Sequence, residues 1–181
     1  MKRILGIILF LCIAILFPSW RSSAVMIGMG TEELTRESSV VIRGEVAAVK
    51  SQWSDDGKTI ITRASVKITD TIRGETNSNM ITVEYAGGEV GEMGLWVEDV
   101  SPLKTNENVI LFLKPIERSA ASAESGIIGG VHRIVGKAQG KYTISKDGIA
   151  EKSGFSVMSG EGVIDNNIAV DELINKIRRV K

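Results

Sequence analysis

A glycine-rich segment, GGEVGEMG at residues 87–94, is the first part of the sequence whose residue types could do chemistry. Backbone N–H groups of such a loop bind phosphate when the loop opens onto a helix N-terminus, usually with a lysine. This segment has no Lys, Ser or Thr, and it is followed by LWVED, which is typical of a strand. We therefore expect the glycines to serve a bulged turn or a close approach of two backbones, and no nucleotide cofactor.

Carboxylates surround the same segment and could be considered as ligands for calcium. They are Glu84, Glu89, Glu92, Glu98 and Asp99. Calcium does take several oxygens from one loop, but the spacing here matches no calcium-loop pattern. A solvated acidic surface is the simpler interpretation, and we predict no metal ligand.

His132 is the only histidine in the chain. Histidine titrates near neutral pH and could act as a general base, whereas a zinc site would need further ligands beside it. The sequence contains no HExxH motif and no GxSxG elbow. The residues around His132 favour an ordinary strand position, and we predict no catalytic residue. A hydrolase or metal-dependent enzyme centred on His132 or on the acidic segment remains the alternative.

Trp53, Trp96 and Tyr85 are the aromatic residues nearest these segments. An exposed tryptophan on a barrel would mark a binding surface. Trp53 ends an expected strand beside a turn, and Trp96 follows the glycines. Positions of this kind more often cap a core, which is the interpretation that the sequence favours for both.

The first 24 residues have the layout of a secretory signal peptide. Lys2 and Arg3 precede an apolar run at residues 4–17, which is shorter than the roughly 20 residues of a membrane-spanning helix. Small residues before position 25 place the expected cleavage after Ala24. An uncleaved anchor is the alternative.

Cys12 lies inside this run and is the only cysteine; Leu11 before it argues against a lipoprotein site. The remaining chain, residues 25–181, would then have no disulfide, which favours a bacterial periplasmic or secreted protein. Its length fits a single domain. Charges of both signs are mixed along it without a basic patch, so we expect no nucleic-acid partner, and no membrane span after cleavage.

Alternation of apolar and polar residues predicts a long hairpin that positions these groups. Its first strand has Val40, Ile42, Val46 and Ala48 on one face. A tight turn follows at Asp55, Asp56 and Gly57. The returning strand places another apolar set inward, namely Ile60, Ala64, Val66 and Ile68.

Shorter elements are expected beyond the hairpin. We predict strands at residues 80–85, 95–97, 131–135 and 141–144, a strand buried on both faces at 109–113, a mobile loop at 117–126, and turns with one weak strand at 146–167. Helices are expected at 31–37 and 170–180, the second with Leu173, Ile174, Ile177 and Val180 on one stripe. This pattern indicates a mainly β protein, a small closed or partly open OB-like barrel with a short N-terminal helix and a C-terminal helix.

These segments resemble a group of uncharacterised exported bacterial proteins, over about residues 31–144 and the terminal helix. The resemblance rests on SSVVIRGEVAAVKSQWSDDGKTI, SVKITDTIRGE, ITVEYAGGEVGEMGLWVED, NENVILFLKP and HRIVGKAQGKYTI. That group is similar in layout to the netrin-like OB-folds, including the tissue inhibitors of metalloproteinases, whose VVIRG strand and FKG turn have counterparts at residues 40–44 and 72–74. The resemblance implies an inhibitor or a partner-binding barrel. The inhibitors grip zinc through an N-terminal cysteine, which this chain lacks after cleavage, so we carry over no inhibitory residue.

The hypothesis that follows is an exported, non-enzymatic module that binds another envelope or secreted protein, a protease being one such partner. Loops at one end of an OB-like barrel often carry the contacts, although this is an argument from fold. The expected partner surface consists of Asp55, Asp56, Gly57, Gly88, Glu89, Glu92 and Trp96. The other alternative is an envelope protein that assembles with itself through a sheet edge.

Overall fold

The computed structural model describes residues 26–116, 130–154, 157–158 and 164–181. The expected signal peptide and the loop expected at residues 117–126 lie outside the described residues. No helix within the described ranges is both long enough and apolar enough to cross a membrane.

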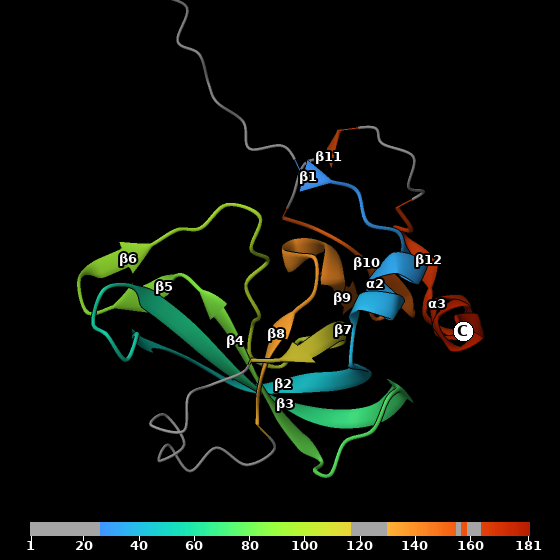
Figure 1. Ribbon diagram of the computed structural model, residues 1–181, viewed down its shortest axis with the longest axis horizontal. Helices are drawn as coiled ribbons and strands as arrows, with labels where there is room; N and C mark the ends of the chain where they lie inside the picture. Colours follow the sequence, from blue (N-terminus) through green and yellow to red (C-terminus); the bar gives the residue numbers. More distant parts are fainter. Residues whose placement is uncertain (1–25, 117–129, 155–156, 159–163) are drawn as a thin grey trace, which may run out of the picture.

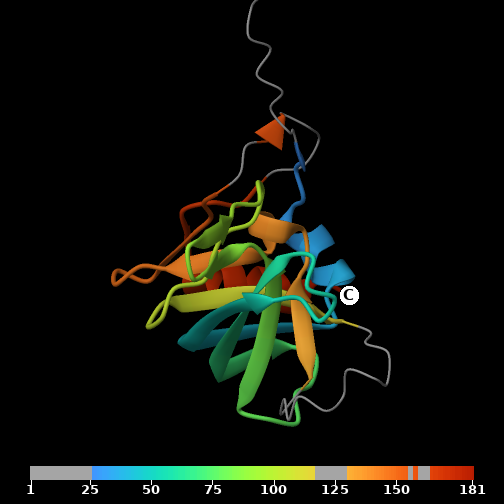
Figure 2. The same cartoon turned by 90° about the vertical axis from the view of Figure 1, so that its left-hand side faces the viewer.

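Strands that are far apart in the sequence close into a five-membered ring, so the mainly β, OB-like barrel is confirmed (Figures 1 and 2). The order is β7-β2-β3-β4-β8, and β8 pairs back onto β7. All pairs are antiparallel except β4–β8, which is parallel. The ring strands are β2 (Val40–Trp53), β3 (Ile60–Arg73), β4 (Met80–Ala86), β7 (Asn108–Pro115) and β8 (Val131–Ile134).

Short strands extend the sheet beyond β7, and others form two separate two-stranded sheets. On the far side of β7 the order continues through β9 to β10 and β12. Two small pairs stand apart, β1 with β11 and β5 with β6. Their bounds are β1 (Met26–Ile27), β5 (Gly88–Val90), β6 (Met93–Leu95), η2 (Lys137–Gly140), β9 (Lys141–Ile144), β10 (Ile149–Glu151), β11 (Val157–Met158) and β12 (Ile168–Ala169).

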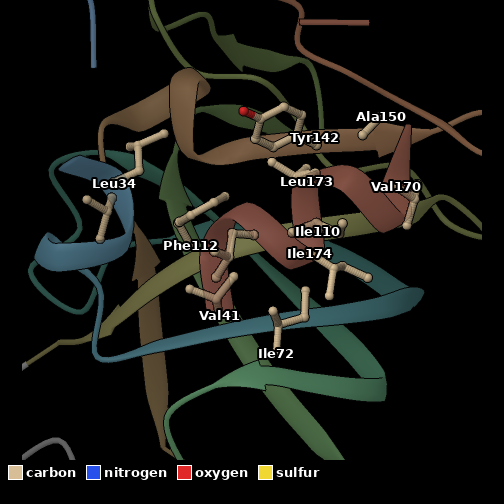
Figure 3. Close-up of a cluster of buried hydrophobic side chains, with 12 residues drawn as sticks. Leu34, Val41, Ile72, Ile110, Phe112, Tyr142, Ala150, Val170, Leu173 and Ile174 are labelled. Carbon is tan, nitrogen blue, oxygen red and sulfur yellow. The ribbon is translucent and has the colours of Figure 1, made fainter. Parts of the chain in front are cut away.

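Both expected helices are present, α2 (Thr31–Glu37) and α3 (Val170–Arg179). They contribute Leu34, Leu173, Ile174 and Ile177 to a buried cluster with β7 and β9, which includes Tyr142 (Figure 3). The α3 stripe therefore packs as its spacing of three and four residues predicts. Val180 lies just beyond the helix, as its C-cap.

Strand β7 is buried on both faces, as predicted. Ile110 and Phe112 join the cluster beneath the helices, whereas Val109, Leu111 and Leu113 join a second cluster inside the barrel. Both faces are covered because the strand lies between the helix layer and the barrel interior. A strand that is covered on both faces has apolar residues at successive positions, which explains the continuous apolar run of β7.

A β-bulge in β2 changes which side chains of this strand face the core. Val46 pairs with Val66 and Ala48 with Ser65, so Ala47 is an extra residue on this strand. The bulge places Ala48 on the exposed side and turns Val49 toward the barrel interior instead. The expectation of Ala48 in the core is therefore wrong, while Val40, Ile42 and Val46 are buried as predicted.

Two other predicted regions differ from the structure in the position or the number of their strands. The short strand expected at residues 95–97 is β6, at Met93–Leu95, and it pairs with β5 inside the glycine-rich segment. The region expected to hold one weak strand, residues 146–167, contains β10 and β11. Glycine is depleted in strands, which is why the sequence pattern gave no signal for the β5–β6 hairpin.

Candidate functional site: the barrel mouth

A groove with a volume of about 560 Å³ opens at the end of the barrel that carries the β5–β6 hairpin. We call it the mouth groove. It is lined by Val49 and Ser51 of β2, Thr62 of β3, residues 85–89 and 94–97, and by Val100, Pro102 and Leu103. Ligand sites are common in the mouths of β-barrels, and this volume lies in their usual range.

The hairpin is held against β2 and β3 by a close backbone approach. Gly88 has a φ of +125°, and a Cβ added there would stand 2.3 Å from Ser51 Oγ and 2.4 Å from Thr62 Oγ1. Neither the backbone angle nor the space admits a larger residue. The expected role of the glycines in a close approach is confirmed at Gly88.

The hydroxyl groups that line the groove form hydrogen bonds with neighbouring parts of the barrel. Thr62 Oγ1 donates to the carbonyl oxygen of Gly87 at 2.6 Å and lies 2.8 Å from Ser51 Oγ. The Tyr85 hydroxyl accepts from the backbone N–H of Leu103 at 3.2 Å, and burial raises the pKa of Tyr85. These groups tie β2, β3 and the chain after β4 together.

Large apolar side chains are exposed around the groove. Trp96, which lines it, is 80% exposed, and Met93 of β6 is 58% exposed. Trp53, at the end of β2, is 40% exposed. The core-cap interpretation is therefore wrong for Trp96 and Trp53. Met93, which lies between Glu92 and Gly94, was not predicted as an exposed residue.

The acidic group expected around the glycines divides into two sets. Glu84 Oε2 accepts from Arg63 Nε at 2.8 Å, with both side chains largely buried. Asp99, also largely buried, lies 3.7 Å from Lys137 Nζ. The other three, Glu89, Glu92 and Glu98, are exposed. In the described part of the chain, no group of three or more His, Cys, Asp or Glu residues is arranged to hold a metal ion.

The residues of the expected partner surface are distributed over two neighbouring loops. Gly88, Glu89 and Trp96 line the mouth groove. Glu92 lies in the turn between β5 and β6. The three residues of the other turn, Asp55, Asp56 and Gly57, do not line the groove. The Ser54 hydroxyl donates to Asp56 Oδ1 at 2.6 Å and lowers the pKa of this carboxyl.

His132 occupies the ordinary strand position that the sequence favoured. It pairs with Val83 of β4 and with Pro115 of β7. Its Nδ1 atom is buried and has no hydrogen-bond partner among the residues that the structure describes, and burial lowers the pKa of the His132 imidazole. His132 lines a cavity of about 230 Å³ together with residues of β3, β4 and the segment that joins them, including Glu75 and Ser78. His132 and the mouth groove are thus separate features.

Comparison with known proteins adds no family to this description: no protein-family model matches the chain, and no curated protein is significantly similar to it.

Proposed function

We propose that the protein is an exported, non-enzymatic binding module that holds another envelope or secreted protein at its mouth groove. The observation that carries the proposal is Trp96, an 80% exposed indole at the edge of an apolar groove. Exposed tryptophans that become buried on association contribute a large share of the affinity in protein interfaces. A protease is the partner class implied by the resemblance to the inhibitor barrels.

The way the hairpin is held supports recognition of a partner without large rearrangement. Gly88 packs directly on Ser51 and Thr62, and the Thr62 hydroxyl bonds to the Gly87 carbonyl. The segment before Trp96 is therefore anchored to the barrel. A groove whose walls are fixed loses less conformational entropy on binding, which favours affinity.

Affinity capture with matched variants tests this proposal. The tagged chain is recovered from its host and immobilised, and proteins retained from envelope and culture-supernatant fractions are identified by mass spectrometry. We expect at least one protein to be retained by the native chain. The same protein should not be retained by the double variant Met93→Ser/Trp96→Ser. Ile27→Ser is the control, because Ile27 is 86% exposed and lies outside the groove lining. Equal retention by all three proteins would contradict the proposal.

Export is the second part of the proposal, and it rests on the N-terminal sequence. Lys2, Arg3 and the apolar run after them have the composition of a signal peptide. We expect the protein recovered from a bacterial periplasm or medium to begin at Val25, within a few residues. Intact mass measurement checks this, and a cytoplasmic protein that still carries Met1 would contradict it.

A further inference from the structure

We infer that the mouth groove takes an extended polypeptide segment that carries apolar side chains and flanking lysine or arginine residues, and that this segment pairs with the free edge of β2. The inference rests on the proposed binding function and specifies the chemistry of the partner. Two independent features of the groove support it: the charge along one wall and the unpaired backbone along the other.

The hairpin that forms one wall of the groove and the chain that follows it carry three exposed carboxylates, of which Glu89 lines the groove itself. Between Glu84 and Leu103 the sequence contains no Lys or Arg. Glu84 is neutralised by Arg63, and Asp99 faces Lys137. The exposed carboxylates of Glu89, Glu92 and Glu98 remain on the hairpin and on the chain that follows it. A cationic segment is therefore attracted, and an anionic one repelled.

The basic residues nearest in sequence to the other wall do not offset this charge. Lys50 lies between Val49 and Ser51, which both line the groove, so alternation places it on the opposite face of β2. Lys58 is exposed in the β2–β3 turn and lies 3.8 Å from Asp56 Oδ2.

The other wall offers an unpaired strand edge. Strand β7 pairs with β2 only as far as Glu45, opposite Asn108. Two further backbone hydrogen bonds join Val46 to Glu107 and Asn106. Beyond the bulge at Ala47, residues 48–53 pair with β3 alone among the described strands.

This free edge lies at the groove, because Val49 and Ser51 belong both to the unpaired stretch and to the groove lining. An extended peptide added to such an edge gains main-chain hydrogen bonds. Its alternate side chains then point toward the apolar lining near Trp96. The intervening ones can carry the positive charges that the exposed carboxylates attract.

Synthetic peptides test both features directly. The probes are acetyl-KVKFKVK-amide, its counterpart with glutamate in place of each lysine, and the lysine peptide with alternate backbone amides N-methylated. Trp96 fluorescence is read in the chain cleaved after Ala24 with Trp53→Phe, which leaves Trp96 as its one tryptophan. We expect the lysine peptide to shift the emission to shorter wavelength and to bind at least tenfold more tightly than the glutamate peptide at low salt. N-methylation should weaken its binding at least tenfold.

Charge-reversal variants assign the site. Glu89→Lys/Glu92→Lys should reduce affinity for the lysine peptide at least tenfold. Asp147→Lys/Glu151→Lys, which reverses two exposed carboxylates outside the groove lining, should leave it within twofold. Equal affinity for the lysine and glutamate peptides would overturn the charge argument. Unchanged affinity after N-methylation would overturn strand pairing.

The remaining outcomes separate this inference from the proposed function. If a captured partner depends on Trp96 but the lysine peptide does not bind, the inference is wrong and the binding function stands. If neither is observed, both are wrong. If the chain forms oligomers that the Met93→Ser/Trp96→Ser variant abolishes on a sizing column, the occupant is a second copy of the chain and the inference is again overturned.

Discussion

Lys152 Nζ lies 4.5 Å from the centre of the Tyr142 ring and has no hydrogen-bond partner within the described structure. The Tyr142 hydroxyl donates to the carbonyl oxygen of Asp165 at 3.2 Å and lies 3.1 Å from Thr31 Oγ1. Burial lowers the pKa of Lys152 from 10.5 to about 8, although the carboxylate of Asp165 acts in the opposite direction. The face of the aromatic ring stabilises the ammonium, but only partly replaces water.

This arrangement predicts a stability that increases with pH. Below pH 8 Lys152 is protonated in both states, and the folded state bears the full cost of burying the charge. Between about pH 8 and 10.5 the unfolded state binds more protons, so the free energy of unfolding rises by up to about 1.4 kcal/mol per pH unit. Lys152→Met should remove this contribution and stabilise the protein at pH 7 by about 3 kcal/mol.

Urea unfolding at pH 7.0, 8.5 and 9.5 measures the effect as a difference between the two proteins. Taking the difference cancels Lys141, whose pKa burial also lowers. It cancels Tyr142 as well, provided that the substitution leaves its surroundings intact; burial raises the pKa of this phenol. Parallel stability curves for the native chain and the Met variant would contradict the prediction.

Gly88→Ala should destabilise the hairpin that forms the mouth groove. The methyl group would stand within 2.4 Å of both Ser51 Oγ and Thr62 Oγ1, and φ is positive. We expect a loss of about 2–3 kcal/mol, measured by thermal unfolding. Gly94→Ala is the matched control in the paired strand, because its nearest atom is Glu89 Cγ at 3.6 Å. Losses of equal size at both positions would count against the close approach at Gly88.

Thr62→Val should loosen the same hairpin while preserving side-chain volume. It removes the hydrogen bond to the Gly87 carbonyl and the contact with Ser51 Oγ. We expect a loss of about 1–3 kcal/mol and faster amide exchange in β5, because a buried carbonyl loses its donor. Ser51→Ala leaves the Thr62–Gly87 bond in place and should cost less. A larger loss for Ser51→Ala would show that the anchor has been misassigned.

The buried ion pair between Lys141 and Glu107 should show strong coupling. Lys141 Nζ lies 2.9 Å from Glu107 Oε1 and donates to the Pro102 carbonyl at 2.7 Å. Removing one partner leaves a buried charge, so Glu107→Gln should cost about 3 kcal/mol. Lys141→Met/Glu107→Gln should cost less than the sum of the two single changes. Strict additivity in urea unfolding would contradict this coupling.

The alternation of residues predicted the barrel well because a regular strand has a fixed period of two. It failed at Ala48, where the bulge at Ala47 shifts the phase of the strand. No residue type marks that position, because the extra residue Ala47 and the displaced residue Ala48 are both alanine. The bulge follows from pairing with β3 and from the departure of β7, which are long-range relationships that a local pattern does not contain.

The candidate site was predictable in its chemistry but not in its exposure. The glycines and acidic residues drew attention to the segment that forms the hairpin at the groove, and Gly88 has the close contact expected of it. Whether Trp96 is buried depends on the position of the β5–β6 hairpin relative to the barrel. Glycine-rich strands carry too weak a local preference to define that position. The separation of Glu84 from the exposed carboxylates likewise depends on Arg63 in a neighbouring strand.

The two-sided burial of β7 makes the helix layer and the barrel interior a single cooperative unit. Phe112 and Leu111 are adjacent in the chain, yet they belong to different apolar clusters. Neither cluster can open without exposing one face of the strand they share. The slowest-exchanging amides should therefore lie in β7, and heat should unfold the helices and the barrel in one transition.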